Sequence, residues 1–286
     1  MILKWKTSRR HIIIGDKPLV MGILNVTPDS FSDGGNFASV PRAVAQAEKL
    51  VAEGADIIDV GGESTRPGSV PVPLDEEIRR VVPVIEAITR RSDVPVSIDT
   101  SKMVVAKAAL DAGAEIINDV SGLRWDQELG SLAGDQKAGL ILMHSRGTFE
   151  SMHHLPPVDD IFVDIGLDFR RSIAIAKRHG VADEQIVLDI GLGFGKTQQQ
   201  NLELLANLDK IVAEFAEFPV LVGASRKSFI AKIDGNDQLA PSDRLAGSIA
   251  AAIRAVSGGA KILRVHDVAP TIQALRTIAA IAGQAR

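Results

Sequence analysis

Acidic and amide side chains follow several short apolar runs of this sequence, and together they could bind a nitrogen-rich ring. Asp99, Asn118 and Asp189 each stand at or near the carboxyl end of such a run. Their oxygens accept hydrogen bonds, and the set suits the donor-rich edge of an aminopyrimidinone. Lys227 and Arg264 add a point charge and a planar guanidinium, and a guanidinium can stack on a heteroaromatic ring.

A second group of residues is suited to an anion. Arg66, Arg226 and His266 supply cationic and hydrogen-bond donor groups. Asn25 supplies a neutral oxygen, which suits a hard cation such as Mg²⁺ that is held mainly by phosphate oxygens and water. The sequence shows no cluster of His and carboxylates typical of a transition-metal site, no Ser-His-Asp pattern and no P-loop.

The elements that must position these residues are eight apolar runs, each followed by a helical stretch. The runs cover residues 20–26, 57–62, 94–99, 115–120, 139–143, 185–190, 219–222 and 260–265. Short continuous apolar runs that alternate with helices predict a parallel sheet buried on both faces. Eight such units predict an α/β fold of the (β/α)8 TIM-barrel type, and a doubly wound open sheet is the alternative.

The remaining pattern fits a single domain over residues 1–286, a length that a TIM barrel commonly has. A short β-hairpin is expected within residues 3–18, and polar loops are expected over 146–160 and 234–241. The expected helices cover residues 39–54, 75–90, 101–112, a short stretch near 129, 161–179, 202–215, 244–256 and 270–282.

A barrel would bring the polar residues at the strand ends to one mouth. Each of them also has a plainer interpretation. Asp99 could simply cap a helix, Lys227 could lie on the surface, and His266 could be structural. Agreement among eight strand ends is harder to explain by capping, so we interpret the mouth as a binding site.

Composition narrows the class of protein. A formal net charge of -4, with 4% aromatic residues and no Tyr, argues against a nucleic-acid binder. The absence of Cys excludes disulfides and thiolate metal sites and favours a reducing compartment. No signal peptide or membrane-spanning run is evident, so we expect a cytoplasmic protein without a membrane partner.

These motifs resemble those of the dihydropteroate synthase family over nearly the whole chain. The matching stretches are residues 25–35, 61–68, 97–100, 118–122, 143–144, 189–196, 225–228 and 264–268. The resemblance implies condensation of 7,8-dihydropterin-6-ylmethyl pyrophosphate with p-aminobenzoate to give 7,8-dihydropteroate and pyrophosphate. It also implies Mg²⁺ as cofactor, inhibition by sulfonamides and a homodimer.

The resemblance assigns three groups of site residues. The pterin would be held by Asp99, Asn118, Met143, Asp189, Gly223, Lys227 and Arg264. Pyrophosphate would be held by Asn25, Arg66, Arg226, Arg264 and His266, with Asn25 as the metal ligand. p-Aminobenzoate would be held by Phe31, Asp33, Thr65, Pro67, Phe194, Lys227 and Ser228. The residues closest to catalysis would be Asn25, Lys227, Arg264 and His266.

The implied chemistry starts with departure of the metal-bound pyrophosphate. The pterin can delocalise the charge that is left on its exocyclic methylene, and the amine of p-aminobenzoate then attacks. An aniline nitrogen is nucleophilic when neutral, so no strong base is required. The two loops over residues 27–37 and 64–73 are expected to close over the substrates and exclude water.

Two alternatives remain at this point. One is a pterin-binding methyltransferase that passes a methyl group from a folate to a corrinoid partner. It would share the Asp and Asn contacts, but it would not need the 65–67 or 225–227 motifs. The other is a non-catalytic paralogue that only binds pterin.

Overall fold

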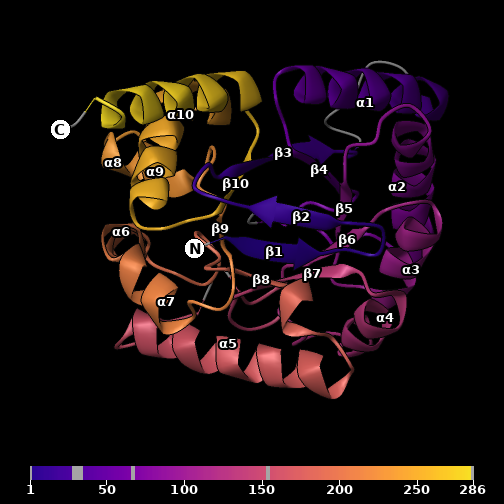
Figure 1. Ribbon diagram of the computed structural model, residues 1–286, viewed down its shortest axis with the longest axis horizontal. Helices are drawn as coiled ribbons and strands as arrows, with labels where there is room; N and C mark the ends of the chain where they lie inside the picture. Colours follow the sequence, from indigo (N-terminus) through magenta and orange to yellow (C-terminus); the bar gives the residue numbers. More distant parts are fainter. Residues whose placement is uncertain (1, 28–34, 66–67, 153–154, 285–286) are drawn as a thin grey trace.

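A computed structural model describes residues 2–27, 35–65, 68–152 and 155–284 of the chain (Figure 1). Eight parallel strands close into a barrel in the order β10-β3-β4-β5-β6-β7-β8-β9, which confirms the predicted TIM barrel and excludes the open sheet. The strands are β3 (Leu19–Asn25), β4 (Ile57–Gly61), β5 (Val96–Asp99), β6 (Ile116–Asp119), β7 (Gly139–Met143), β8 (Ile186–Asp189), β9 (Val220–Val222) and β10 (Ile262–Val265).

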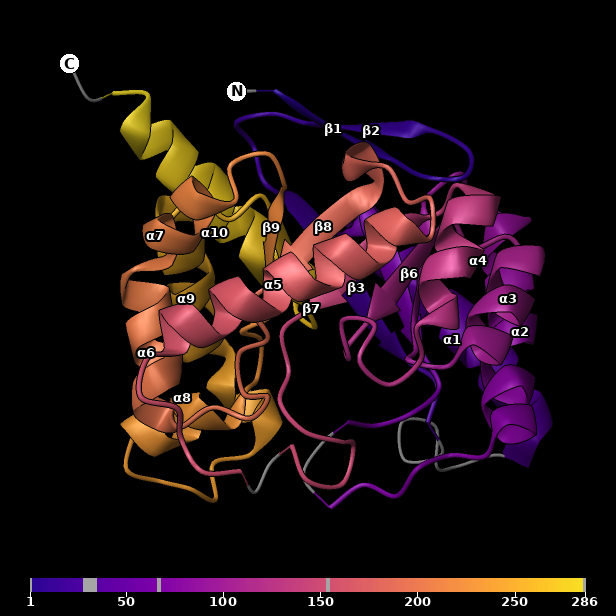
Figure 2. The ribbon, with the colours of Figure 1, turned by 90° about the horizontal axis from the view of Figure 1, so that it is seen from below.

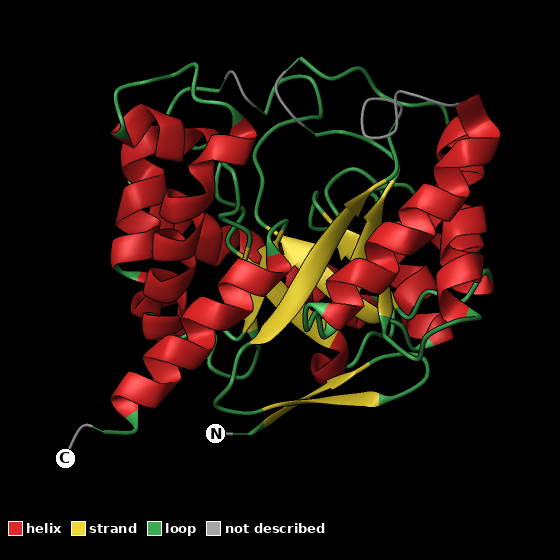
Figure 3. Ribbon diagram, turned by 90° about the horizontal axis from the view of Figure 1, so that it is seen from above, coloured by secondary structure: helices red, strands yellow, loops and turns green. Residues whose placement is uncertain are grey.

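Helices surround the barrel, as the views from its two sides show (Figures 2 and 3). They are α1 (Gly35–Ala52), α2 (Leu74–Thr89), α3 (Met103–Asp111), α4 (Glu128–Gln136), α5 (Ile161–Arg178), α6 (Gln198–Ala206), α7 (Leu208–Glu214), α8 (Ser228–Ile233), α9 (Leu245–Ser257) and α10 (Val268–Ala282). Helix α2 is typical, because Val81, Val84, Ile85 and Ile88 recur at helical spacing and are buried against the sheet.

The helices differ from the predictions in four places, since α1 and α6 each begin four residues earlier than expected, one expected helix is divided and one helix is additional. The expected helix over 202–215 is divided, because Asn207 leaves helical geometry at φ −128° and ψ 35°. Its backbone N–H and its side-chain amide both donate to the carbonyl of Glu203 at 3.0 Å, so α6 ends on this residue and α7 begins after it. The six-residue helix α8 was not predicted, since it is too short to show a clear period.

The predicted hairpin forms from β1 (Leu3–Lys6) and β2 (His11–Ile14), which pair antiparallel. It lies across the end of the barrel opposite to the loops that follow the strands (Figure 2). Trp5 and Ile14 are fully buried there against the inward side chains of the barrel, among them Met21 and Ile57. The indole of Trp5 donates to the carbonyl of Gln185 at 2.9 Å. The hairpin therefore closes the amino-terminal end, and the site is confined to the carboxyl end.

Among the described residues, no helix is both long and apolar enough to cross a bilayer.

Candidate active site

The strand register aligns the predicted residues at the carboxyl end of the barrel. Asn25 of β3 pairs with Gly61 of β4, Gly61 with Asp99 of β5, and Asp99 with Asn118 of β6. Polar groups from three of these four neighbouring strands therefore lie in one row. Gly61 adds no side chain to that row: a Cβ there would lie 3.6 Å from the Cβ of Asp99 and 3.8 Å from the Oδ1 of Asn25.

Two cavities open at this end, and we call them the strand-end cavity and the loop cavity. The strand-end cavity includes every predicted pterin residue in its lining: Asp99, Asn118, Met143, Asp189, Gly223, Lys227 and Arg264. The loop cavity, of about 500 Å³, is lined by Asn25, Thr65, Phe194, Arg226, Lys227, Ser228, Arg264, His266 and their neighbours. The structure thus brings together the predicted residues that it describes.

The two cavities share part of their lining. Thr65, Asp99, Phe194, Lys227 and Arg264 line both. A molecule in the strand-end cavity would therefore meet one in the loop cavity beside Lys227 and Arg264. Four predicted residues, Phe31, Asp33, Arg66 and Pro67, lie outside the described residues.

Arg264 is held by two carboxylates. Its Nε donates to the Oδ2 of Asp59 at 2.6 Å, and its Nη2 donates to the Oδ2 of Asp99. Burial raises the pKa of Asp99 to about 7, and Asp59 adds to this, whereas Arg264 acts in the opposite direction. Burial alone would lower the pKa of Arg264, but Asp59 and Asp99 outweigh it and raise that pKa.

Asp59 is a site residue that sequence reasoning missed. It is fully buried, and its Oδ2 also accepts a hydrogen bond from the Nδ2 of Asn118 at 3.1 Å. Its Oδ1 has no hydrogen-bond partner among the described residues. A carboxylate within the buried apolar strand Ile57–Gly61 was the available signal, because an acid is rarely buried without a partner.

Asp189, the last residue of β8, also lines the strand-end cavity and is buried. Its Oδ1 accepts a hydrogen bond from the backbone N–H of Gly191 at 2.8 Å. Burial raises the pKa of its carboxyl group, while that backbone bond and the charge of Lys227 oppose the rise. The carboxylate is thus fixed by its own turn, beside a cation.

Lys227 lies over an aromatic ring. Its Nζ is 4.0 Å from the centroid of the Phe194 ring, a cation–π distance. A Cβ at Gly193 would lie 3.4 Å from the Cδ of Lys227, so this glycine lets the lysine stem pass close to the turn after β8. Lys227 therefore connects the predicted pterin and p-aminobenzoate residues.

The predicted anion ligands differ in how they are held. The Nδ1 of His266 lies 3.1 Å from the Oγ of Ser225. Arg226 forms a bidentate ion pair with Asp267, with Nε to Oδ2 at 2.9 Å and Nη2 to Oδ1 at 2.6 Å. The charge of Arg226 is therefore already balanced by a carboxylate.

Two lysines outside the predicted set brace the loops of the mouth. Lys102 donates to Glu63 at 2.7 Å, to the fully buried Glu77 at 2.6 Å and to the carbonyl of Val72 at 2.8 Å. It therefore ties together the two ends of the loop that carries Thr65. Lys196 donates to the carbonyls of Gly191 and Phe194 at 2.8 and 3.1 Å, and burial lowers its pKa to about 7.

A metal site would need ligands from outside the protein. Among the described residues, no group of three or more His, Cys, Asp or Glu could hold a metal ion. Asn25 lines the loop cavity and offers one neutral oxygen. This donor set fits a hard cation that takes its other ligands from a phosphate group and water.

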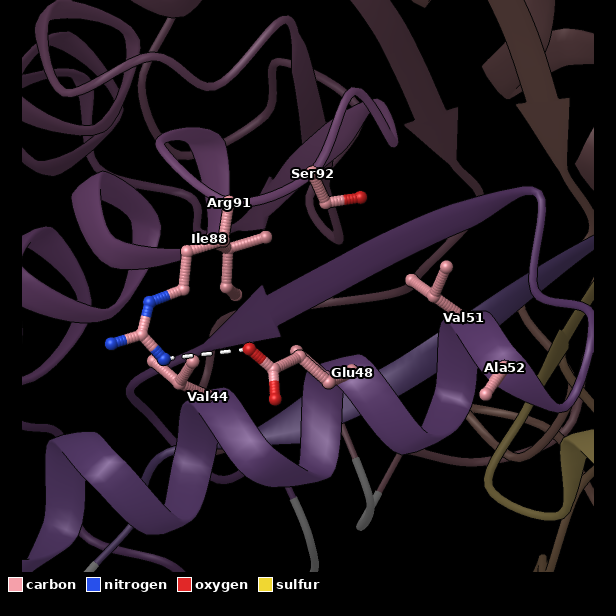
Figure 4. A pocket seen from close by; sticks show the side chains of 8 residues that line it. Val44, Glu48, Val51, Ala52, Ile88, Arg91 and Ser92 are labelled. Atoms are coloured by element: carbon pink, nitrogen blue, oxygen red, sulfur yellow. Dashed lines mark hydrogen bonds and ion pairs between the residues drawn. The ribbon is translucent and has the colours of Figure 1, made fainter.

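A further hollow, of about 240 Å³, lies on the outside of the barrel between α1 and α2 (Figure 4). Its lining is mostly apolar, including Val44, Val51 and Ile88, with the Glu48–Arg91 ion pair at 3.4 Å. It includes none of the predicted site residues.

Comparisons with known proteins agree with this geometry. A family described as pterin binding enzyme matches residues 21–266, a span that includes every predicted site residue. The dihydropteroate synthase of Synechocystis sp. is 48% identical over 254 residues, which cover 89% of this chain and 86% of the relative.

Solved structures extend the likeness to the fold. The Xanthomonas albilineans dihydropteroate synthase with 4-aminobenzoic acid matches with a TM-score of 0.90 and 41% identity, over 99% of both chains. The Yersinia pestis dihydropteroate synthase in complex with a sulfonamide drug matches with a TM-score of 0.90 and 40% identity, over 98% of this chain and 100% of that one.

Proposed function

The chain belongs to the family of pterin-binding enzymes, and from that premise we propose how its residues divide the work of one reaction. It catalyses the dihydropteroate synthase reaction, in which 7,8-dihydropterin-6-ylmethyl pyrophosphate and p-aminobenzoate give 7,8-dihydropteroate and pyrophosphate. The relatives' names do not support the methyltransferase alternative. The observation that carries the division of roles is the shared lining of the two cavities.

The strand-end cavity takes the pterin. Asp189 and Asn118 form hydrogen bonds with the polar edge of the ring, and the negative charge of Asp99 stabilises the pterin cation. Met143 and Arg264 pack against the faces of the ring, and Gly223 leaves room beside it. The buried position of these groups supports the assignment, because a hydrogen bond to an ionised group is strong where water is excluded.

The loop cavity takes the pyrophosphate and p-aminobenzoate. Asn25, Arg264 and His266 bind the pyrophosphate, and the assignment extends by resemblance to Arg66. Asn25 would also be a ligand of Mg²⁺, which when bound neutralises charge on the leaving group. Thr65, Phe194 and Ser228 surround p-aminobenzoate, and the assignment extends by resemblance to Phe31, Asp33 and Pro67.

The residues of this mouth favour ionisation followed by attack of the amine. The carbon–oxygen bond breaks while Arg264 and His266 compensate the departing anion, and Asp99 and Asp189 stabilise the pterin cation. Such fixed charges act as preorganised electrostatic stabilisation. The amine of p-aminobenzoate then forms the new carbon–nitrogen bond and loses its proton to water. We also propose that this chain binds sulfonamides, as the Yersinia pestis relative does, and that they occupy the p-aminobenzoate pocket.

Three further features belong to the proposal. They are a homodimer, a cytoplasmic location, and the absence of nucleic-acid and membrane partners.

The decisive assay measures pyrophosphate release by the purified chain. Release should require both substrates together and should stop when either is omitted. Release that needs only the pterin substrate would indicate hydrolysis, and no release with both substrates would favour a pterin-binding paralogue without synthase activity.

A further inference from the structure

The turn between β9 and α8 contains a strained residue at its centre. Arg226 has φ +59°, in the left-handed region that L side chains rarely adopt. Such a conformation persists only where the surrounding structure determines it, and it is enriched at functional sites. The sequence places this residue directly between Ser225 and Lys227, both of which line the loop cavity.

Contacts from two other elements hold Arg226 in place. Its backbone N–H donates to the Oγ of Ser248 in α9 at 2.9 Å, and its carbonyl accepts from the Nη1 of Arg244 at 3.0 Å. Its guanidinium forms the bidentate pair with Asp267, which follows β10. Backbone and side chain are thus fixed independently, although the side chains of Arg226 and Asp267 remain 31% and 21% exposed.

The pair joins two loops that carry proposed site residues. On the β10 side, Asp267 follows His266, whose ring contacts Ser225 at 3.1 Å. On the β9 side, Arg226 precedes Lys227, whose Nζ lies over the Phe194 ring. A displacement of Arg226 would therefore move Lys227 relative to Phe194.

We propose that Arg226 and Asp267 form a positioning pair that holds Lys227 over Phe194 and so shapes the p-aminobenzoate pocket. Arg226 then does not bind pyrophosphate directly. Its Nε and one Nη2 donor are used by Asp267, and its charge is balanced there. This inference rests on the proposed function, since it assigns a cause to the shape of one of the proposed pockets.

Three variants separate a positioning role of Arg226 from direct binding of the anion. Arg226→Gln with Asp267→Asn removes both charges together, Asp267→Asn removes the partner alone, and Arg226→Lys keeps the charge but not the planar fork. We expect the KM for p-aminobenzoate to rise about tenfold in all three, the scale of a lost charged bidentate contact. Pyrophosphate affinity, measured by calorimetry with Mg²⁺, should stay within about twofold of the parent in the double variant.

The opposite pattern would overturn the proposal. A tenfold loss of pyrophosphate affinity in the double variant with an unchanged KM for p-aminobenzoate would make Arg226 an anion ligand. A KM for p-aminobenzoate equal to that of the parent in Arg226→Lys, or in all three variants, would also contradict a positioning role. Arg170→Gln is the matched control, because it breaks the Arg170–Glu214 ion pair at 2.7 Å on the outer helices and should change neither quantity.

Failure of the proposed function gives a different result. In that case the parent chain releases no pyrophosphate with both substrates. Equilibrium binding of p-aminobenzoate, titrated in the presence of pyrophosphate and Mg²⁺, still reports on the pair and should weaken about tenfold in Asp267→Asn. Unchanged binding in that folded variant would reject the pair whatever the activity.

Discussion

Asp189 gives the most direct test of the pterin assignment. Asp189→Ala removes a buried carboxylate from the strand-end cavity. Hydrogen bonds to charged groups contribute about 1.5–3 kcal/mol, so pterin affinity should fall at least about tenfold. The fold should persist, because the residue lies at the mouth and not within the packed interior of the barrel.

Calorimetry of pterin binding measures this effect, and circular dichroism checks the fold. Asp183→Ala is a suitable control, since Asp183 lies in an exposed ion pair with Lys177 at 2.8 Å. Unchanged pterin affinity in a folded Asp189→Ala variant would remove Asp189 from the site.

Asp99 predicts a pH dependence near neutrality. Its pKa rises from 3.8 to about 7, chiefly through burial, so the carboxyl group is largely protonated below pH 7 in the unliganded enzyme. Its contribution to stability is present in full below about pH 4, and it is lost as pH rises through about 7. Activity should change in the opposite direction, because the proposed role of Asp99 requires the ionised form.

The pH profile of kcat/KM for the pterin substrate tests this expectation. The value should rise through pH 7, and Asp99→Asn should lower it throughout and flatten the rising limb. A rising limb that survives unchanged in Asp99→Asn would assign the titration to another group.

Sequence reasoning found site residues by their position after apolar runs, and this worked for side chains that end a strand. It passed over Asp59, because that residue lies within a strand and not at its end, and its contacts with Arg264 and Asn118 are visible only in the structure. It also could not assign a conformation to Arg226, because a positive φ at a non-glycine residue depends on tertiary contacts. Contacts between residues that are distant in the sequence were therefore not predicted.

At the scale of elements, the N-terminal hairpin should contribute stability and not catalysis. Trp5 is fully buried at the end of the barrel opposite to the loops, where Figure 2 shows the hairpin. Trp5→Ala should lower the free energy of unfolding by about 3–5 kcal/mol through lost burial and packing. The kcat of the folded Trp5→Ala variant should stay close to that of the parent.

Urea denaturation and steady-state kinetics check the two parts separately. Ile13→Ala is the matched control in the same hairpin, since Ile13 is 55% exposed and should change stability little. A large loss of rate in folded Trp5→Ala would show that the closed end influences the mouth.

The elements themselves were predictable where a strong period or a buried run exists. All eight barrel strands lie within predicted runs to within two residues, because parallel strands buried on both faces are continuously apolar. The break at Asn207 and the short α8 were not predictable from periodicity, since the break lies in the backbone conformation of one residue and α8 is too short to show a period.

At the scale of the whole molecule, the barrel places two cavities with shared lining residues next to each other, and we expect their occupancy to be coupled. Thr65, Phe194 and Lys227 line both cavities, so a ligand in one contacts residues that form the other. The number of strands predicted a common mouth, and the resemblance assigned separate groups of residues to the pterin and to p-aminobenzoate, but the shape of the division between the two cavities was not predicted. That division depends on the paths of the loops, which tertiary contacts such as those of Lys102 determine.

This arrangement predicts an order of binding. Pyrophosphate and Mg²⁺ should bind first beside Asn25, Arg264 and His266, and they should complete the p-aminobenzoate pocket. The loops expected to close over it include Phe31 and Pro67, which lie outside the described residues. Ordered loops should raise p-aminobenzoate affinity at least about tenfold, because the ligand then no longer bears the cost of selecting a rare closed state.

Titration of p-aminobenzoate with and without pyrophosphate and Mg²⁺ measures this coupling. Removal of Mg²⁺ by a chelator should weaken pyrophosphate binding, because the metal neutralises the charge of pyrophosphate, and should therefore also weaken p-aminobenzoate binding. Asn25 offers the metal one neutral oxygen, and its other ligands would be phosphate oxygens and water. By the same reasoning, Mg²⁺ should bind only weakly to the protein without pyrophosphate, and sulfonamides should compete with p-aminobenzoate. Equal p-aminobenzoate affinity in the two titrations would mean that the pocket is already formed in the unliganded barrel, so that the loops contribute no coupling.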